Sequence, residues 1–492
     1  MTLNPSLNIL ILRNNNFLSA DASLSFYPSL TLLDISSNNL VTLQNNTFNM
    51  QRELVELRMN NNKISELGVT TFSGLVSLQI LQLGENLIAS LPCRGFKHLE
   101  SLRKLYLEGN VINEICSEAF TGLSKVETLD LSDNHIEDIL GEALKYLTSL
   151  KELKLAKNKI KTISDKSFVQ LFRLSVLDLS ENIIEKIHNK AFSQSSSLKQ
   201  LDIKDNQVNR FPGEALKHLT MLEKLNIGQN MFAIIDESAF SNLKTLKSIN
   251  ITSCPYLRSI EKEAFANLEY LEEVIISSNP SLANIDPFFF ITIHKSVRHI
   301  DLHGNNLSYI PLPIPSLPSL VYIDLSSNPW YCDCIVQNMS MVFLEMVHNN
   351  VNITRVRCHH PTHLRNRDII TLDMECDNTD ISDDTIDNAA LIAAVCSVVI
   401  VIIVIILMII LKHLNNQYSC KTPPTVPAQS PLISSKVQQC QHNQEPRYVN
   451  RTNKTSITVN HLYIHHQQET LLRHDQYFNH SSREKHYYLE YE

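Results

Sequence analysis

The sequence predicts an α/β solenoid with a parallel sheet along its concave wall. The phrase L-x-x-L-x-L-x-x-N returns about every 24 residues, and fourteen units can be counted between residues 7 and 328. The L-x-L part alternates apolar and polar residues, which is the period of a strand. A single unit has too few apolar side chains to fold alone, so neighbouring units must stack. We therefore expect successive L-x-L segments to pair about 4.8 Å apart.

Two ladders of side chains should build the core of these units. An asparagine closes each phrase, and its amide can bond backbone groups that stacking would otherwise leave buried and unpaired. The positions are Asn15, Asn38, Asn62, Asn86, Asn110, Asn134, Asn158, Asn182, Asn206, Asn230, Cys254, Asn279, Asn305 and Asn328. A second ladder should fill the convex side, with Phe48, Phe72, Phe96, Phe120, Phe168, Phe192, Phe240, Phe265 and Phe290, and with Leu144 and Leu216 replacing Phe in two units.

Units such as LDLSDN at 129–134 and LDLSEN at 177–182 resemble the extracellular leucine-rich repeat family. They are similar to Toll-like receptor ectodomains and to insect adhesion receptors such as Capricious, Tartan and Connectin. The resemblance covers roughly residues 3 to 376 and implies a right-handed, horseshoe-shaped solenoid. It assigns residues 1–327 to the repeats and 328–376 to a cysteine-rich C-terminal cap.

The cap is expected from four cysteines after the last repeat, because the final turn's apolar edge needs a lid. They are Cys332, Cys334, Cys358 and Cys376. By resemblance, Cys332 pairs with Cys358, and Cys334 pairs with Cys376. A zinc site is the rival interpretation of four cysteines. It is disfavoured by the C-x-C spacing and by an oxidising exterior.

Three further cysteines lie in the repeats. Cys93 and Cys116 fall in consecutive turns, so their backbones should stack near the separation that a disulfide requires. Their one-residue offset leaves open whether the side chains meet. Cys254 replaces a ladder asparagine, and we expect it to be a free, buried and inert thiol.

Residues 389–411 form an apolar run of 23 residues without charge or proline, which predicts one transmembrane helix. An acidic linker at 377–388 precedes it, and Lys412 follows it. The positive-inside rule then places the repeats outside the cell, as in a single-pass type I protein of the plasma membrane. Residues 1–6 contain no signal peptide, so we expect a truncated start or an isoform that does not reach the surface.

Five sequons fall in the predicted exterior, namely Asn45, Asn250, Asn306, Asn338 and Asn352. Asn250 occupies an x position of its strand phrase. A glycan there would project from the concave wall and direct a protein ligand to other turns.

The tail, residues 412–492, is rich in Gln, Asn, Ser and His and is expected to be disordered. It is too short for a Toll-type or kinase signalling domain. Tyr448 and Tyr477 each precede x-Asn and are candidate phosphotyrosine ligands of an SH2 adaptor, against the alternative of merely solvated tyrosines. Cys420 is a candidate palmitoylation site. Metal binding by His465 and His466 is disfavoured for lack of rigid geometry.

The charges give no sign of an enzyme or of a nucleic-acid-binding surface. The chain has 51 Asp plus Glu residues and 43 Lys plus Arg residues, and its basic residues form no continuous stripe in the sequence. Acids recurring at the x position of the strand phrase should form an exposed, solvated face; they are Asp130, Asp178, Asp202, Asp301 and Asp324.

Lysines and acids also alternate between adjacent units on the expected wall. Lys151, Lys154 and Lys157 follow a unit with Glu127, Asp130 and Asp133. This juxtaposition suits either self-association or ion pairs within one wall.

No catalytic residue, cofactor or metal site is predicted. Two binding functions remain. One is recognition or adhesion through a partner on a facing cell, including a homophilic partner. The alternative is an innate-immune-type Toll-like receptor, co-receptor or decoy that captures an extracellular protein ligand. The short tail favours adhesion.

Overall fold

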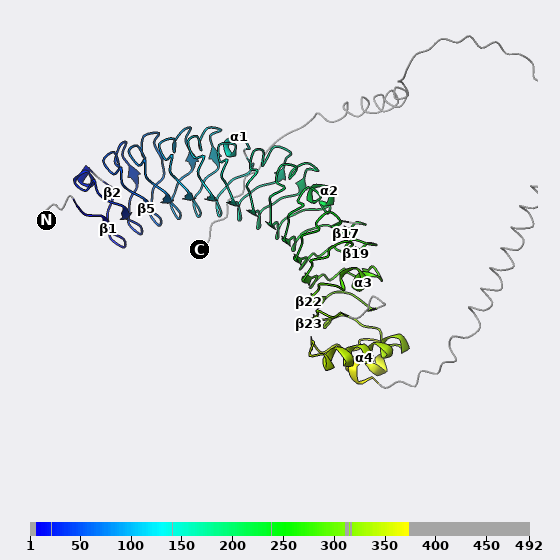
Figure 1. Cartoon of the computed structure of the whole chain (residues 1–492). Coiled ribbons are helices and arrows are strands. Elements are labelled where there is room, and N and C mark those ends of the chain that lie inside the picture. Colours follow the sequence, from blue (N-terminus) through cyan, green and yellow to red (C-terminus); the bar gives the residue numbers. More distant parts are fainter. Residues whose placement is uncertain are drawn as a thin grey trace, which may run out of the picture. The chain divides into compact units, whose positions relative to one another are not determined.

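The computed structural model describes residues 6–20, 22–139, 141–237, 239–309, 314 and 317–372, all within one compact unit that spans residues 1–377. These residues form a curved solenoid in which the longest sheet lines the inner side of the bend, while α1, α2 and α3 lie on the outer side (Figure 1). The predicted parallel-sheet solenoid is therefore confirmed.

The inner sheet has fifteen strands in chain order, and every pairing is parallel. Fourteen strands come from the fourteen repeats, and the fifteenth, β24, comes from the C-terminal cap. The strands are β1 (Ile9–Ile11), β3 (Leu32–Asp34), β5 (Glu56–Arg58), β6 (Ile80–Gln82), β8 (Lys104–Tyr106), β10 (Thr128–Asp130), β11 (Glu152–Lys154), β13 (Val176–Asp178), β15 (Gln200–Asp202), β16 (Lys224–Asn226), β18 (Ser248–Asn250), β20 (Glu273–Ile275), β22 (His299–Asp301), β23 (Tyr322–Asp324) and β24 (Asn352–Ile353).

Short strands on the outer side form four small sheets, β2-β4, β7-β9, β12-β14 and β17-β19-β21. They are β2 (Ser19–Ala20), β4 (Thr42–Leu43), β7 (Ser90–Leu91), β9 (Glu114–Ile115), β12 (Thr162–Ile163), β14 (Lys186–Ile187), β17 (Ile234–Ile235), β19 (Ser259–Ile260) and β21 (Asn284–Ile285). Two of the three interruptions between these sheets fall at repeats that share the sequence GEAL, which forms the one-turn helices α1 (Gly141–Leu144) and α2 (Gly213–Leu216). At α2 the preceding Pro212 has no backbone N–H to donate to a ladder.

The asparagine ladder works as predicted. Asn158 donates from Nδ2 to the carbonyl oxygens of Leu131 in the previous repeat (2.9 Å) and of Leu155 in its own (3.1 Å). Its Oδ1 accepts from the backbone nitrogen of Ile136 at 3.0 Å. One buried side chain thus ties two turns together and satisfies backbone groups that face no water. Asn15, in the first repeat, is exposed and bonds only carbonyl groups of its own turn.

The convex phenylalanine ladder is buried throughout, and Leu144 and Leu216 are buried in the two units without Phe. Neighbouring rings stack, as between Phe72 and Phe96 with centroids 5.7 Å apart. Beside Leu216, Phe211 fills the space left by the shorter side chain and meets Phe240 edge-on at 5.2 Å. The sequence pattern did not identify this substitute.

The cap is built by α4 (Cys334–His348), by β24 and by two 3-10 turns, Thr362–Leu364 and Ile369–Thr371; helix α3 (Phe289–Ile293) and the 3-10 turn Ala22–Phe26 belong to the repeats. Trp330 is fully buried under the cap, and its Nε1 donates to the Leu325 carbonyl oxygen at 2.8 Å. The lid therefore closes the last turn with both a helix and an additional strand.

Disulfides join Cys332 to Cys358 and Cys93 to Cys116. Cys334 is also disulfide-bonded, while Cys376, its expected partner, lies outside the described residues. Cys254 is free and buried, and burial raises the pKa of its thiol to about 11.

The linker at 377–388, the apolar run at 389–411 and the tail at 412–492 also lie outside the described residues. Within the described part of the chain, no helix combines the length and the apolar character that crossing a bilayer would require.

Candidate binding wall on the concave sheet

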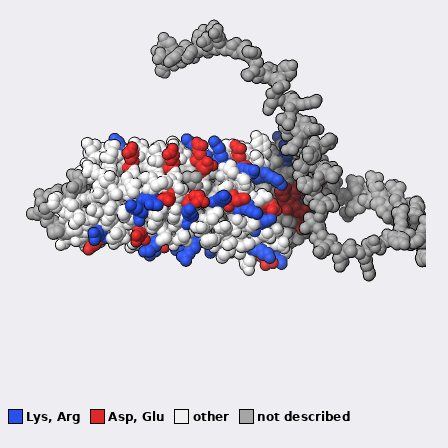
Figure 2. Space-filling view, turned by 90° about the horizontal axis from the view of Figure 1, so that it is seen from above, with Lys and Arg blue, Asp and Glu red and all other residues white. Residues whose placement is uncertain are grey.

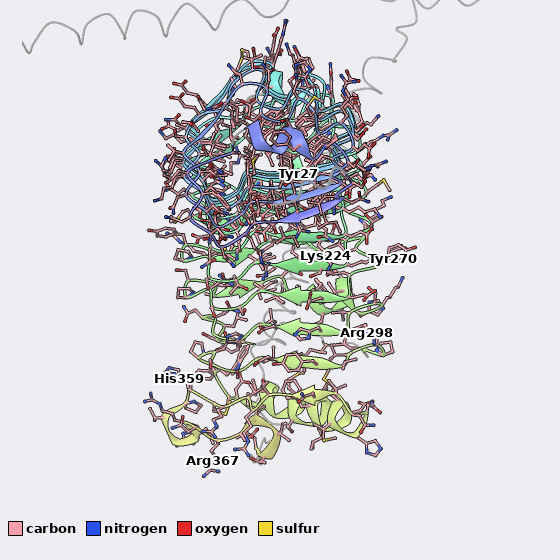
Figure 3. The ribbon with its side chains drawn as sticks, turned by 90° about the vertical axis from the view of Figure 1, so that its left-hand side faces the viewer. Tyr27, Lys224, Tyr270, Arg298, His359 and Arg367 are labelled. Carbon is pink, nitrogen blue, oxygen red and sulfur yellow. A yellow bond between two sulfur atoms is a disulfide. The ribbon has the colours of Figure 1, made fainter. Side chains whose placement is uncertain are left out.

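Each three-residue strand of the inner sheet after β1 buries its central residue and places the first and third residues on the concave wall. In β10, for example, Leu129 is fully buried between Thr128 and Asp130. The strands pair in register, so equivalent residues of successive repeats form continuous columns along the wall. Figure 3 shows the strands of the later repeats side by side, with Lys224 on this wall.

The acids of the third column are not the solvated face that we expected. Asp130 is buried, and Asp178, Asp202, Asp301 and Asp324 are half-buried. Each carboxylate accepts a hydrogen bond from the backbone N–H two residues later, as Asp130 does from Ser132 at 3.0 Å. These acids therefore stabilise the turn that follows the strand, and the expectation failed because it ignored this local bonding.

Ion pairs between successive repeats neutralise part of the wall. Lys154 lies 3.2 Å from Asp130, and Lys151 lies 2.7 Å from Glu127. Arg58 lies 3.7 Å from Asp34, which is almost fully buried and was not among the predicted acids. The pairs made by Lys151 and Lys154 fit the interpretation of these charges as ion pairs within one wall. On the face of the repeats seen in Figure 2, acidic and basic side chains are also interspersed.

Charges of alternating sign lie along the flank, one residue before several of the strands. Glu127 is held between Arg103 and Lys151, and four repeats later Glu223 is held between Lys199 (3.0 Å) and Lys247 (2.8 Å). Hydrogen bonds from Lys247 and Lys199 lower the pKa of Glu223 to about 2. The sequence analysis missed these pairs, although opposite charges 24 residues apart were a signal for them.

At the C-terminal end of the wall, aromatic and polar side chains gather on adjacent strands. The His299 ring stacks on the Tyr322 ring with centroids 4.5 Å apart. Asp324 accepts hydrogen bonds from the Thr354 hydroxyl at 2.6 Å and the Tyr322 hydroxyl at 3.2 Å. Burial acts to raise the pKa of Asp324, but these bonds and those from Ser326 outweigh it and lower the pKa.

The sequons take different positions. Asn45, Asn306 and Asn352 are exposed, while Asn338 lies in α4. Asn250 lies on the concave wall in β18, where it is half-buried and its Oδ1 accepts from both the backbone nitrogen and the hydroxyl of Thr252. The candidate tail sites Tyr448, Tyr477 and Cys420 lie outside the described residues.

Comparison with known families and structures identifies the repeat type. Residues 52–112 and 220–280 match the leucine rich repeat family, and residues 113–243 match the BspA type leucine rich repeat region. This solenoid fold is typical of protein-interaction domains.

Three solved structures are similar in fold. A leucine-rich repeat protein of Leptospira interrogans is 26% identical with a TM-score of 0.61, over 71% of this chain and 84% of that one. TLR13, in its complex with ssRNA13, is 23% identical with a TM-score of 0.57, over 75% of this chain and 60% of that one. Drosophila Toll, in its complex with Spatzle, is 18% identical with a TM-score of 0.59, over 75% of this chain and 57% of that one.

This chain thus spans less than two thirds of the TLR13 and Toll chains. Residues 52–280 are leucine-rich repeats, and the solenoid that they help to form is similar in structure to the ectodomains of Toll-like receptors.

Proposed function

We propose that this protein is a cell-surface receptor that binds a protein partner on a facing cell through its concave wall and flanks. The observation that carries the proposal is the fifteen-stranded wall, whose two columns on the concave side hold acidic, basic, amide, aromatic and aliphatic side chains in fixed register. A rigid, chemically varied surface of this kind matches a protein better than a small molecule, because specificity comes from many positioned contacts.

The distribution of charge favours a protein over a nucleic acid. Binding a phosphate backbone requires several unpaired Lys or Arg side chains along one surface. Here Lys154 and Arg58 are paired with acids of neighbouring repeats, and half-buried aspartates occupy much of the third column. The RNA in the TLR13 complex is thus a weaker guide than the protein in the Toll–Spatzle complex.

Disulfides support an extracellular location, because they persist in oxidising compartments. The apolar run at 389–411 would anchor the chain, and the sequons would carry glycans. We place adhesion ahead of ligand capture, since many weak contacts between two membranes add through multivalency. The alternative is capture of an extracellular protein ligand by a Toll-like receptor, co-receptor or decoy; Toll, found in a complex with Spatzle, favours it.

The test is a two-colour aggregation assay of non-adherent cells that express the chain behind a supplied signal peptide, with surface staining to verify export. We expect clusters, either between expressing cells or between expressing cells and a second cell type. The wall variant Lys104→Glu/Lys224→Glu should weaken clustering, because both side chains are exposed in the first column. The matched outer-side variant Lys166→Glu/Lys190→Glu should leave it unchanged.

Well-stained cells that stay single with every cell type would refute adhesion. If a soluble ectodomain then bound a secreted protein and lost that binding in the wall variant, ligand capture would replace adhesion. Equal loss in both variants would mean that the concave wall is not the binding surface.

A further inference from the structure

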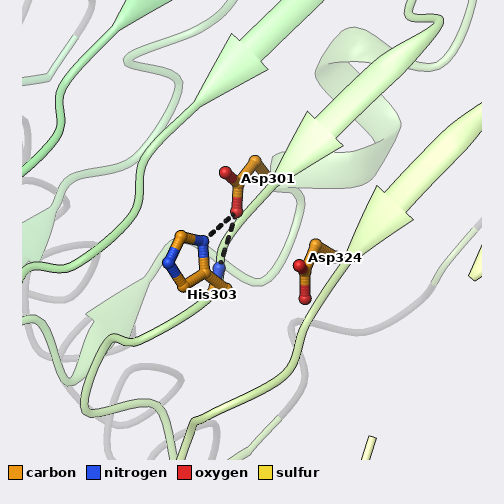
Figure 4. A group of neighbouring side chains, drawn as sticks. All are labelled: Asp301, His303 and Asp324. Carbon is orange, nitrogen blue, oxygen red and sulfur yellow. Dashed lines mark hydrogen bonds and ion pairs between the residues drawn. The ribbon is translucent and has the colours of Figure 1, made fainter. Parts of the chain in front are cut away.

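Three side chains that suit a metal ion converge at the C-terminal end of the concave wall. The proposed binding of a protein partner does not depend on them. Asp301 ends β22, Asp324 ends β23, and the two residues are register partners in the sheet. His303 follows Asp301 by two residues, and one ligand atom from each of the three lies within 4.8 Å of the others (Figure 4). Residues 301 and 324 are brought together only by the stacking of repeats.

The fold itself does not require this combination. At the equivalent positions Asp130 and Asp178 accept from Ser132 and Ser180, so serine satisfies the position that His303 occupies. Asn250 accepts the same pair of bonds from Thr252. A neutral side chain is therefore enough for the turn. Neither the charge of Asp301 nor the imidazole of His303 is explained by the repeat.

The charge of this group is also less balanced than at Asp34 and Asp130, although the register partners Asp178 and Asp202 likewise have no ion pair among the described residues. Asp34 has Arg58 as an ion-pair partner, and Asp130 has Lys154. Among the described residues, no Lys or Arg forms an ion pair with Asp301 or Asp324, and His303 is the one basic partner, with Nδ1 2.8 Å from Asp301 Oδ1. Two carboxylates on adjacent strands repel each other unless a cation lies between them.

We propose that Asp301, His303 and Asp324 bind a divalent metal ion of the zinc class. One nitrogen and two oxygen ligands suit Zn²⁺, whereas Ca²⁺ and Mg²⁺ prefer oxygen alone. Ligands about 2.1 Å from a tetrahedral zinc lie roughly 3.4 Å apart, so Asp301 and His303, now 2.8 Å apart, would separate slightly around the ion. The metal would replace the proton between these two atoms, and a small rotation of Asp324 would complete the group.

Neighbouring hydroxyl groups contact two of the three ligands, Asp324 and His303. Thr354 and Tyr322 donate to Asp324, and the other ring nitrogen of His303, Nε2, lies 3.5 Å from the Ser278 hydroxyl. Such outer hydrogen bonds fix the direction of metal ligands. The side chains of His303 and Asp301 are 40% and 18% exposed, so coordination positions stay open toward the wall for water or for a ligand from a partner.

The test measures Zn²⁺ by equilibrium dialysis and Co²⁺ by visible absorption on the full chain in detergent. Because other histidines add a background, the readout is the difference between variants. We expect His303→Ser and Asp324→Asn each to lose one equivalent of metal and its Co²⁺ absorption. His303→Ser installs the residue found in other repeats, and Asn at 324 keeps the acceptor that Asn250 demonstrates.

Two control variants should keep the full stoichiometry. His359→Ser removes another exposed histidine of the C-terminal region. Asp202→Asn changes a different pair of acids on adjacent strands, Asp178 and Asp202, which has no histidine beside it. Equal metal binding by the wild type and His303→Ser would overturn the proposal. The loss of one metal equivalent from both His303→Ser and Asp202→Asn would also overturn it, because such a loss would not be specific to the proposed site. Circular dichroism of each variant establishes that the fold is retained.

Discussion

The ammonium group of Lys247 lies 2.8 Å from Oε2 of Glu223, and Lys199 approaches the other carboxylate oxygen from the opposite side at 3.0 Å. A glutamate held by two lysines in adjacent turns links three repeats along the flank. The two lysines are exposed and Glu223 is half-buried, so the contribution of these pairs to stability is small at physiological salt. Their effect on proton binding is nevertheless measurable.

The first prediction concerns pH. The pKa of Glu223 is lowered from 4.5 to about 2, so the stabilisation by this group is fully present above pH 4.5 and is lost as the pH falls through about 2. As the pH is lowered from 4.5 to about 2, the melting temperature of Glu223→Gln should therefore fall less than that of the wild type. Glu237→Gln, at an exposed site without an ion pair among the described residues, is the control. Identical acid profiles for the wild type and Glu223→Gln would contradict the pairing.

The second prediction concerns the asparagine ladder. Asn158→Ala removes four hydrogen bonds, those donated to the carbonyl oxygens of Leu131, Leu155 and Ala156 and the one accepted from the backbone nitrogen of Ile136, and leaves buried backbone groups unsatisfied. Each such group costs about 1–3 kcal/mol, so we expect a loss of roughly 3 kcal/mol in the free energy of unfolding, measured with urea. Asn113→Ala, at an exposed position, should cost little. A similar cost for both variants would show that the ladder amide has no special role.

The third prediction concerns the free thiol. Cys254 is buried and its pKa is raised to about 11, so little thiolate forms at neutral pH and reagents cannot reach it. Iodoacetamide should leave the peptide that contains Cys254 unmodified in the native protein and modify it fully in guanidinium chloride. Mass spectrometry separates this peptide from those of other cysteines. Rapid modification under native conditions would mean that this turn opens.

A fourth prediction concerns the disulfide between Cys93 and Cys116, which closes a loop with a sequence separation of 23. Its removal in Cys93→Ser/Cys116→Ser frees the unfolded chain, and we expect a loss of about 3 kcal/mol in the free energy of unfolding. This value is an upper limit for the loss in a solenoid, because adjacent turns already hold the two ends of the loop together. If this variant is as stable as the wild type, the disulfide does not stabilise the fold.

The sequence by itself determined the repeat architecture of this protein. Each repeat contacts mainly its neighbours, so the local phrase that ends in Asn158 encodes both the strand and the stacking that satisfies it. The same regularity predicted the buried phenylalanine ladder and the burial of Cys254.

Only the tertiary structure decided how polar side chains of different repeats meet. Asp130 looked solvated in the sequence but is buried, because its carboxylate turns back onto Ser132 and meets Lys154 of the next repeat. His303 and Asp324 become neighbours through strand register, and the buried Phe211 meets Phe240 edge-on beside Leu216. Such contacts depend on side-chain direction and on packing between turns, which a repeating pattern of residue types does not encode.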